Sequence, residues 1–547
     1  MHSRAALGAS SISLKSGHAG EELIASVSRT FHEHEILVTG ANGFLGKTLL
    51  ALLLDRYPQF RHVHILLRPG KAGSAEHRFW NETAASPPLA PTITRTGKEA
   101  LQTKISVWQG DIGAPQCGLS GEAVERLRGA AGLIINCAGK VDFLPPVDEA
   151  FRSNVDGIEN VAALAQQIGA KLLHVSTCYV CGEADGLIEE TEPILGFYPQ
   201  RRGPGDSTFQ HAEELLHARK LIRQIYEPAG VEGPAAGRRP REITQRLTAL
   251  GRQRAASWGW ANTYTYSKSL GEQIISSTAG LEYSIVRPSI VESAWRFPFS
   301  GWIEGGRTAA PLVLMALDGL RDWPVREDAP LEVVPVDMVA AAILVVAHAL
   351  LLGLHEPVYQ LGSADTNPIT LGSVVALLHE EAKVRAKRDG NASYARVPLD
   401  WLAGRWRRSR MRFLSADEVQ ERQQKLQQKI ARTERWLGGM KEVLRRTALP
   451  GQRLLDNWST ELRKMDLQAK FRQQTLDQYL PFVLHNRYVF ESENIRVAYA
   501  ALAEPDRQLL PWTPERIDWK DYWINNQIGG IEKWVQPEAV RDWTFKV

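Results

Sequence analysis

The sequence predicts an α/β protein, with a doubly wound parallel sheet followed by a C-terminal, mainly helical domain. Short, continuously apolar runs recur from residue 35 onward, and helix-like segments separate them. Continuous rather than alternating apolar strands are typical of a parallel sheet that helices cover on both faces. A chain of 547 residues is longer than one hydrophobic core usually accommodates, so two domains are expected.

The elements of this sheet follow in order from residue 35. Helices are expected at "FLGKTLLALLLDRY" (44–57) and "NVDGIENVAALAQQIG" (154–169), and a last strand signal stands at "VYQLGS" (358–363). The strands before it are expected at "EILVTG" (35–40), "HVHILLR" (62–68), "KISVWQGDI" (104–112), "GLIINCAG" (132–139), "KLLHVST" (171–177) and "YSIVRPS" (283–289).

The chain divides into a tail and two domains. Residues 1–34 begin with a Ser- and Gly-rich stretch and are expected to form a flexible tail. Residues 35–365 form the sheet domain, in which 196–260 are an insertion of Gly/Pro loops and basic helical pieces placed where it could shape a ligand site. Residues 366–547 form the helical domain.

Composition excludes several classes of protein. The net charge of +3 is too small to predict nucleic acid as the main partner. The four cysteines make no disulfide framework, and Cys178 and Cys181 lack the second pair that a zinc site needs, so buried thiols and no metal are expected. The N-terminus has no long apolar stretch, and the apolar run 338–354 is shorter than the ~20 residues that span a bilayer. A cytoplasmic protein with a buried helix at 338–354 is expected.

Gly40, Gly43 and Gly46 form a G-x-x-G-x-x-G loop between the first strand and the first helix. In dinucleotide-binding sites the first glycine permits a tight turn, the second lets the backbone approach a pyrophosphate, and the third allows close packing of helix on sheet. Because the loop follows a strand, opens a helix and begins a βα series, it predicts a Rossmann-type dinucleotide site.

The second strand ends in Arg68, with Lys71 and Arg78 beyond it, where an NAD-binding site usually has an acidic residue. A guanidinium there suits the 2′-phosphate of NADPH. The alternative is an exposed arginine at a strand end. Asp111, at the end of the third strand, would either meet the adenine or hold a loop turn.

Tyr264 and Lys268 are one helical turn apart in "NTYTYSKSLGE" and share a helix face. A nearby ammonium is expected to lower the tyrosine pKa and produce a proton donor for a carbonyl under reduction. Tyr266 points elsewhere and is expected to pack or to line a pocket. Ser176 and Thr177 supply hydroxyl groups at the end of the fifth strand.

The motifs "VTGANGFLG", "HVSTCYV", "NTYTYSKSLGE" and "YSIVRPSIVESAWRFPFSGWIEG" together resemble those of the extended short-chain dehydrogenase/reductases. Within these, residues 35–365 are most similar to the fatty acyl-CoA reductases and related thioester reductases. The resemblance implies that Tyr264 is the acid, Lys268 its partner and Thr177 the second hydroxyl, with Ser176 as the less favoured alternative. The long insertion and a loosely matched C-terminal region depart from the family pattern.

The expected cofactor is NADPH, held by the glycine loop, the ends of the strands and the catalytic helix. The predicted cofactor-binding residues are Gly40, Asn42, Gly43, Phe44, Leu45, Gly46, Arg68, Arg78, Asp111, Ile112, Ala138, Lys140, Asn154, Tyr264, Lys268, Pro288 and Ile290.

The resemblance implies NADPH-dependent reduction of a long-chain fatty acyl-CoA to the aldehyde and then to a primary alcohol, with release of CoA. The alternatives are a thioester reductase that stops at the aldehyde, a sugar-nucleotide epimerase or dehydratase of the same superfamily, and a non-catalytic dinucleotide sensor. A homo-oligomer is compatible with the sequence.

Two further segments each have two interpretations. The aromatic loop 295–305 walls an acyl channel or packs the two domains together. Residues 401–450 carry 13 Lys and Arg against 5 Asp and Glu, and form either a solvated helix face or a surface for CoA phosphates or an anionic membrane, which would make the protein peripheral.

Overall fold

The computed structural model describes residues 26–71, 73–203, 205–227, 239–306, 308–317, 320–388, 411–415 and 475–535, with scattered positions between 417 and 473. The predicted basic stretch 401–450 lies mostly outside these residues, as does the first part of the predicted tail.

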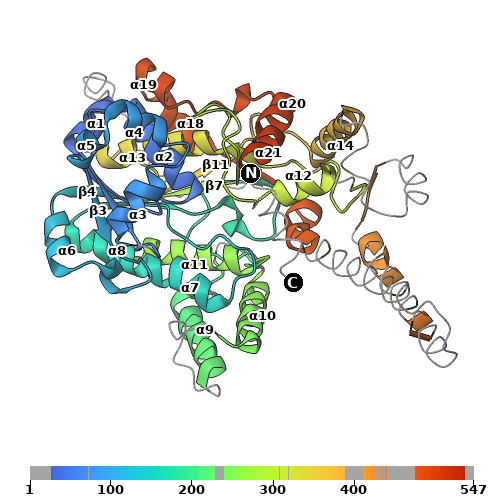
Figure 1. Ribbon diagram of the computed structural model, residues 1–547. Coiled ribbons are helices and arrows are strands. Elements are labelled where there is room, and N and C mark those ends of the chain that lie inside the picture. The colour runs from blue at the N-terminus through green and yellow to red at the C-terminus, as the bar shows by residue number, and fades with distance from the viewer. Residues whose placement is uncertain are drawn as a thin grey trace, which may run out of the picture.

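A seven-stranded sheet lies at the centre of the molecule in the order β11-β7-β5-β4-β1-β2-β3 (Figure 1). All neighbouring strands are parallel, which confirms the predicted doubly wound α/β fold. The strand order reverses between β1 and β4, and the crevice at such a switch point is where these sheets bind ligands. The strands are β1 (Glu35–Thr39), β2 (His62–Leu67), β3 (Ile105–Gln109), β4 (Ala131–Asn136), β5 (Lys171–Val175), β7 (Tyr283–Pro288) and β11 (Val358–Leu361).

Each face of the sheet has its own hydrophobic cluster, because successive strand residues point to opposite faces. On β1, Ile36 and Val38 belong to one cluster and Leu37 to the other. The first cluster is covered by α1 (Val27–Glu33), α2 (Phe44–Arg56), α13 (Val336–Leu352) and α18 (Glu493–Ala500). The second is covered by α6 (Gly121–Leu127), α7 (Val147–Asn154), α8 (Asp156–Ile168) and α11 (Thr263–Ser277).

The insertion forms two long helices, α9 (His211–Tyr226) and α10 (Arg241–Trp258), which extend away from the sheet below α7 and α11 in Figure 1. Glu214 of α9 is buried and accepts hydrogen bonds from Arg254, Trp258 and the hydroxyl of Tyr266. Tyr266 has no exposed surface, which confirms that it packs. The buried Glu214 carboxylate therefore anchors the insertion to α11, together with Gln273 of α11, which accepts from the Gly196 N–H and donates to the Phe197 carbonyl oxygen.

The other elements of the described residues are three strand pairs and further helices. Three short parallel pairs lie outside the main sheet, formed by β6 (Asp185–Ile188) with β13 (Arg487–Phe490), β8 (Ile290–Glu292) with β10 (Val333–Pro335), and β9 (Asp322–Trp323) with β12 (Arg412–Phe413). The remaining helices are α3 (Ala75–Arg78), η1 (Phe79–Thr83), α4 (Ala90–Thr96), α5 (Lys98–Gln102), η2 (Pro115–Gly118), η3 (Cys178–Cys181), α12 (Ala310–Leu317), α14 (Leu371–Arg388), η5 (Pro481–His485), α19 (Glu504–Leu509), η6 (Pro514–Arg516), α20 (Trp519–Asp521), η7 (Tyr522–Ile528) and α21 (Gly529–Trp534).

The described C-terminal residues share the core of the sheet domain rather than building their own. Ile495, Leu510 and Trp523 belong to the same cluster as the α13 face of the sheet. In addition, β13 adds to β6, more than 290 residues earlier in the chain. This part of the predicted helical domain is therefore an outer layer of the sheet domain.

The predicted flexible tail is wrong for residues 27–33, which form α1. Ser26 caps this helix by accepting a hydrogen bond from the Arg29 N–H at 3.2 Å. Val27, Thr30 and Phe31 are buried at the i, i+3, i+4 spacing of an amphipathic helix. The Ser- and Gly-rich composition that predicted a tail applies only upstream of this stripe.

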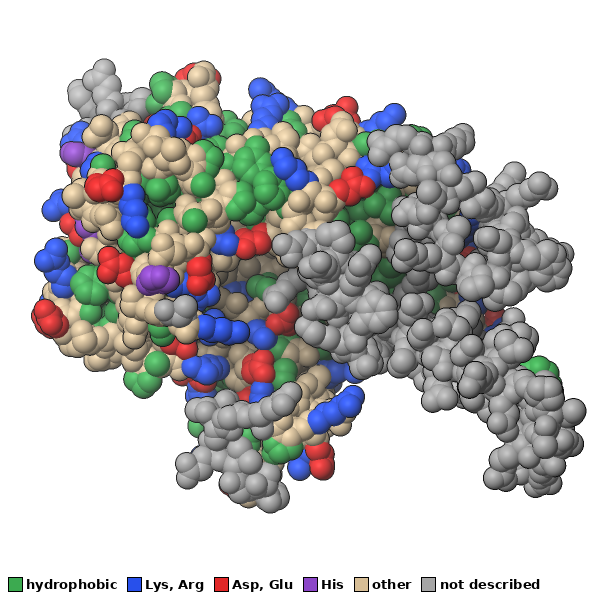
Figure 2. All heavy atoms as spheres, viewed as in Figure 1, with side chains coloured by type: hydrophobic (Ala, Val, Ile, Leu, Met, Phe, Trp, Pro, Cys, Tyr) green, Lys and Arg blue, Asp and Glu red, His purple; other side chains and the backbone are tan. Residues whose placement is uncertain are grey.

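The apolar run at 338–354 is a buried helix, as predicted, because α13 covers the sheet and residues 336–350 of it are buried. Among the helices of the described residues, none has both the length and the apolar character needed to cross a bilayer. On the face shown in Figure 2, described Lys and Arg side chains are interspersed with Asp and Glu.

Candidate active site

The glycine loop joins β1 to α2 with the tight contacts that its spacing predicts. Gly40 has φ +72, and a Cβ there would lie 2.6 Å from the Ala138 backbone nitrogen at the end of β4. A Cβ on Gly46 would lie 2.2 Å from the Gly40 carbonyl oxygen. Gly43 is the N-cap of α2, whose first-turn N–H groups, at Phe44 and Leu45, have no partner within the helix and are suited to bind an anion.

A pocket opens at the switch point between β1 and β4, beside this loop. Eight predicted cofactor residues line it: Gly40, Asn42, Gly43, Arg68, Arg78, Asp111, Ile112 and Ala138. Thr39, Leu66, Leu67, Gly110, Cys137, Gly139 and Ser153 complete the lining and were not predicted. The glycine cradle and this crevice fit a nicotinamide dinucleotide, whose pyrophosphate would lie on the α2 N-terminus.

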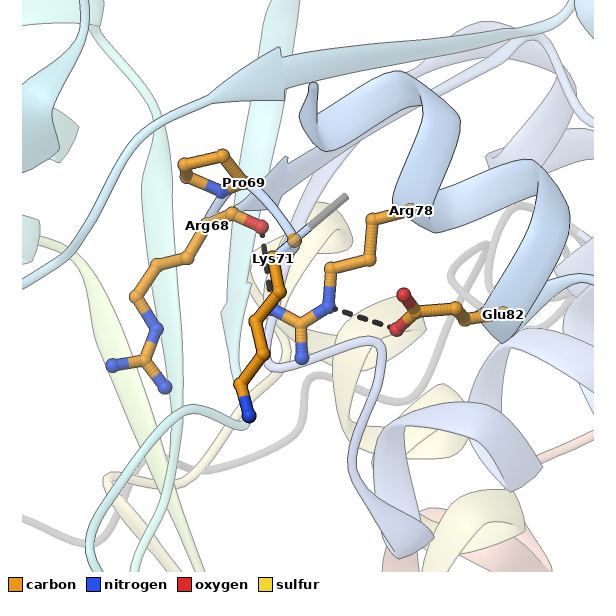
Figure 3. Close-up of a pocket in the computed structure, with 6 residues that line it drawn as sticks. Arg68, Pro69, Lys71, Arg78 and Glu82 are labelled. Atoms are coloured by element: carbon orange, nitrogen blue, oxygen red, sulfur yellow. Dashed lines mark hydrogen bonds and ion pairs between the residues drawn. The ribbon is translucent and has the colours of Figure 1, made fainter. Parts of the chain in front are cut away.

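A second pocket continues from the first and is basic. Arg68 borders both pockets, and Lys71, Arg78 and Glu82 line the second one with it. Figure 3 shows the side chains of Arg68, Lys71 and Arg78 extending to the same side of the β2 end. The Arg78 guanidinium donates to Glu82 and to the Arg68 carbonyl oxygen, both at 3.2 Å. One guanidinium is thus fixed, while Arg68 and Lys71 are exposed to incoming ligand.

Asp111 holds a turn, as one of the two alternatives for it has it, and it also lines the pocket. Its Oδ1 accepts from the Gly113 N–H at 3.0 Å, and its Oδ2 accepts from Arg152 at 2.8 Å. Its role toward adenine stays a prediction.

The other predicted cofactor residues lie deeper in the fold. The Asn154 side chain accepts from the Lys140 N–H at 2.8 Å and donates to the Lys140 carbonyl oxygen at 2.9 Å and to Ser267 at 3.0 Å. It thereby fixes the segment after β4 against α11. The Lys140 ammonium is paired with Asp142 and Glu149.

Tyr264, Lys268 and Thr177 meet at the carboxyl end of β5. Asn262 caps α11 by accepting from the Thr265 N–H at 2.9 Å, which starts the helix just before Tyr264. The buried Lys268 ammonium donates to the Val175 carbonyl oxygen at 2.6 Å. A side-chain hydrogen bond joins Thr177 to Tyr264.

Two hydroxyl groups flank this point, and their contacts distinguish them. Thr177 donates to the Pro288 carbonyl oxygen at 3.4 Å and also bonds Tyr264. The Ser176 hydroxyl is buried and has no hydrogen-bond partner among the described residues. The Tyr264 contact favours Thr177 as the second hydroxyl of the site. Pro288 at the end of β7 is the acceptor for Thr177, and Ile290 in β8 packs against the cluster that contains Cys178 and Tyr179.

The expected lowering of the Tyr264 pKa by Lys268 is not what the structure shows. Tyr264 is partly exposed, yet dense protein surroundings raise its pKa to about 12, and the Thr177 hydrogen bond offsets only part of that. Burial lowers the pKa of Lys268 to about 8, against the opposing effect of Glu272. Desolvation of the phenolate outweighs the Thr177 hydrogen bond, and the nearby Cys178 and Glu272 raise the pKa of Tyr264 further, so Tyr264 carries its proton at neutral pH.

The family follows from comparison with known sequences. The family model described as "Male sterility protein", an NAD-binding family, matches residues 38–343, which is more than half of the chain. The chain belongs to the male sterility protein family. The predicted resemblance to the fatty acyl-CoA reductases is confirmed, and the protein is an oxidoreductase of the extended short-chain type with a nicotinamide dinucleotide cofactor.

Two relatives of this male sterility protein family member cover 91% and 65% of its length. "Probable fatty acyl-CoA reductase 5" of Arabidopsis thaliana is 28% identical over 512 residues, covering 91% of this chain and 96% of the relative. "Alcohol-forming fatty acyl-CoA reductase" of Simmondsia chinensis is 28% identical over 373 residues, covering 65% and 72%. The crystal structure of the terminal R domain from the myxalamid PKS-NRPS biosynthetic pathway has the same fold, with a TM-score of 0.51, 18% identity, and coverage of 91% and 90%.

An aromatic cluster lies beside Tyr264, and the sequence did not predict it. Phe143 lies with its ring centroid 6.3 Å from that of Tyr264, 5.8 Å from Tyr479 and 5.2 Å from Phe482. Phe482 in turn contacts Tyr179 at 5.0 Å. These rings come from segments more than 300 residues apart, and the only sequence signal was the aromatic richness of the C-terminal region.

The loop 295–305 packs against the C-terminal layer, so the second interpretation of it holds for the residues in contact. Phe299 and Trp302 each lie with ring centroids 5.1 Å from that of Trp534 in α21. Trp302 is 4% exposed and is part of a small buried cluster. These rings hold the outer layer to the loop, and an acyl channel along this loop stays a prediction.

Proposed function

We propose that the protein uses NADPH to reduce the thioester carbonyl of a long-chain fatty acyl-CoA, first to the aldehyde with release of CoA and then to the primary alcohol. The observation that carries the proposal is the meeting of Tyr264, Thr177 and Lys268 next to a pocket that combines a glycine cradle with a basic end. The names and broad coverage of the fatty acyl-CoA reductase relatives support the acyl-CoA substrate.

The residues of this chain would act on the carbonyl oxygen of the substrate. Bound NADPH supplies a hydride to the carbonyl carbon. Tyr264 is protonated at neutral pH because its pKa is raised to about 12. It would donate that proton to the carbonyl oxygen as negative charge develops there, and the Thr177 hydroxyl would hydrogen-bond the same oxygen. The resulting hemithioacetal expels CoA, and the aldehyde is reduced by the same groups because it presents the same carbonyl.

Lys268 would complete the site. Its ammonium is held by the Val175 carbonyl oxygen and lies close to Gly139, where a Cβ would come within 3.7 Å of its Nζ. Gly139 lines the cofactor pocket, so Lys268 can reach a ribose hydroxyl of the dinucleotide from this position. Arg68, Lys71 and Arg78 would bind the 2′-phosphate, which is the argument for NADPH over NADH.

The test is incubation of the purified protein with NADPH and acyl-CoAs of graded chain length, with Tyr264→Phe beside the wild type. Wild type should consume two NADPH per acyl chain and form the alcohol. Tyr264→Phe should lose turnover by about 100-fold or more while its NADPH affinity stays within about threefold, since only the proton donor is removed.

Tyr266→Phe is the matched control, because Tyr266 lies on the same helix and its hydroxyl bonds Glu214 rather than the site. It should keep turnover. One NADPH per chain with aldehyde as product would reject alcohol formation, and no oxidation with any acyl thioester would reject the proposal as a whole.

A further inference from the structure

His174 is a buried titratable group at the active site that the mechanism above does not use. It lies on β5, three residues before Thr177, and its side chain has no exposed surface. Its Nε2 is 3.3 Å from the Lys268 Nζ, and its Nδ1 is 3.0 Å from the side-chain amide nitrogen of Asn136. Buried imidazoles need a partner for each nitrogen, and these two contacts supply them.

The contact with Asn136 continues to the cofactor pocket. Asn136, which is fully buried at the end of β4, is hydrogen-bonded to the Thr39 hydroxyl at the end of β1. The Thr39 Oγ1 also accepts from the Ala138 N–H at 3.3 Å, and Thr39 lines the glycine-loop pocket. A line of four side chains therefore runs under the cofactor pocket across three neighbouring strands and ends at Lys268.

Burial and charge in this region keep the His174 ring neutral. Burial, and then the positive charge of Lys268, lower the pKa of His174 well below its ordinary value, so the imidazole is neutral. The other titratable groups that act on Lys268 are Cys137 and Glu272, and Glu272 already accepts from the Arg287 guanidinium at 3.0 Å and 3.2 Å. The direct neighbours of the Lys268 Nζ are thus the Val175 carbonyl oxygen, which accepts, and the neutral His174 ring, whose role depends on its tautomer.

The tautomer of His174 then depends on the protonation state of Lys268. An ammonium requires the lone pair of Nε2, which places the ring proton on Nδ1. For Asn136 to accept that proton, its amide must be turned over from the orientation in which its nitrogen faces Nδ1 and its oxygen accepts from Thr39. A neutral lysine would instead accept from Nε2–H, with Nδ1 accepting from the amide nitrogen. The two orientations of the Asn136 amide have the same shape, so the four side chains can form hydrogen bonds with either protonation state of Lys268. The ammonium state selects the arrangement with the His174 proton on Nδ1.

We propose that His174 is a positioning residue that accepts a hydrogen bond from the Lys268 ammonium and holds it in the orientation that serves Tyr264 and the cofactor. The inference rests on the proposed function, in which Lys268 acts as an ammonium ion. An acceptor on Nζ stabilises the charged form, so its removal should make Lys268 lose its proton at lower pH.

Two substitutions of His174 test the roles of its two ring nitrogens separately. His174→Gln keeps an amide oxygen near the Nε2 position facing Lys268, whereas His174→Asn keeps a polar group near the Nδ1 position and withdraws it from Lys268. His174→Gln should retain kcat within about threefold, and His174→Asn should lower it by about 30-fold or more. The basic limb of the kcat–pH profile should move about one unit lower in His174→Asn, because the Lys268 ammonium is lost sooner.

His64 provides matched controls, since it is a histidine on β2, 2% exposed, bonded to Glu35 at 2.9 Å and Trp108 at 3.1 Å rather than to the site. His64→Gln and His64→Asn should leave the basic limb where it is, whatever they do to stability. Equal loss of kcat in both His174 variants with an unmoved limb would mean that His174 only packs, and would overturn the inference.

A measurement on the free protein removes the dependence on turnover. With ¹⁵N-labelled histidine, the His174 signals, assigned by their loss in His174→Gln, should show a neutral ring with the proton on Nδ1 and no titration between about pH 5 and pH 8. Lys268→Met should change the Nε2 shift. A titrating His174, or an Nε2 shift that is unchanged in Lys268→Met, would overturn the inference even if the protein reduces acyl-CoA, while absence of acyl-CoA reduction in wild type would reject the proposed function alone.

Discussion

Arg68 stands at the junction of the two pockets, and this position connects one residue to the choice of cofactor. It borders both the glycine-loop pocket and the basic pocket. Arg78 beside it is oriented by Glu82 and by the Arg68 carbonyl oxygen. A dinucleotide that crosses the switch point would place its adenosine ribose at the end of β2. A 2′-phosphate would there meet one oriented guanidinium and one that is free to close on it.

Arg68→Ala should therefore change cofactor preference rather than catalysis. A charge-assisted hydrogen bond contributes about 1.5–3 kcal/mol, so the KM for NADPH should rise by about 10- to 100-fold while the KM for NADH changes by less than about threefold. Steady-state kinetics with both cofactors measures this. Arg61→Ala is the control. Arg61 lies just before β2, at the opposite end of that strand from Arg68, and pairs with Glu35. Equal changes for the two cofactors would refute a 2′-phosphate contact.

The sequence predicts those site residues that are recognised by their spacing along the chain. The glycine spacing and the i, i+4 pair of Tyr264 and Lys268 are local, and the structure places both where they were expected. The pKa of Tyr264 and the contact of Lys268 with His174 depend on burial and on a neighbouring strand. Neither follows from spacing, so the direction of the Tyr264 shift was predicted wrongly and His174 was missed.

The segment from Tyr479 through β13 is the element that brings the C-terminal layer to the active site. Tyr479 donates to the Thr308 carbonyl oxygen at 2.6 Å, and η5 carries Phe482 against Phe143 and Tyr179. β13 then pairs with β6 close after Thr177 in the chain. Helix and strand patterns within this segment are readable from the sequence, but its partner strand is not, because pairing over such a separation leaves no local signal.

Phe482→Ala should weaken the binding of long acyl chains, since Phe482 joins the aromatic cluster next to Tyr264 and is half-buried. Loss of one ring contact of about 1–2 kcal/mol would raise the KM for long-chain acyl-CoA by about 5- to 30-fold, and less for short chains. Kinetics over a series of chain lengths measures this. Phe299→Ala, in the loop that packs on Trp534, should lower thermal stability without any dependence on chain length. The reverse pattern would assign the acyl chain to the loop.

Across the whole molecule, buried carboxyl groups tie the C-terminal layer to the sheet domain. Glu332 accepts from the Phe490 N–H at 2.8 Å and the Ser363 N–H at 2.9 Å. Glu190 likewise accepts from the Asn494 N–H at 2.8 Å. Backbone N–H groups hold these carboxyls in place but do not neutralise them, so burial raises the pKa of Glu332 and of Glu190 to about 7.

A raised pKa in the folded state has a definite sign for stability. From about pH 4.5, where a free glutamate titrates, up to about pH 7, the folded protein holds a proton that the unfolded chain has lost, so the free energy of unfolding falls as pH rises through this window. For Glu332 the shift corresponds to a loss on the order of 3 kcal/mol across the window.

Glu332→Gln should remove the Glu332 part of this pH dependence, because the amide cannot ionise, while the part due to Glu190 remains. Its own lost hydrogen bond costs about 1–2 kcal/mol at every pH, so the variant should be less stable than wild type at pH 5 and should gain on it as pH rises to 8. Denaturant unfolding at several pH values measures the difference. Glu125→Gln, a substitution of a glutamate that is 67% exposed, should run parallel to wild type throughout. If the free energy of unfolding of Glu332→Gln also changes with pH in parallel with that of wild type, then Glu332 does not hold an additional proton in the folded protein between about pH 4.5 and pH 7.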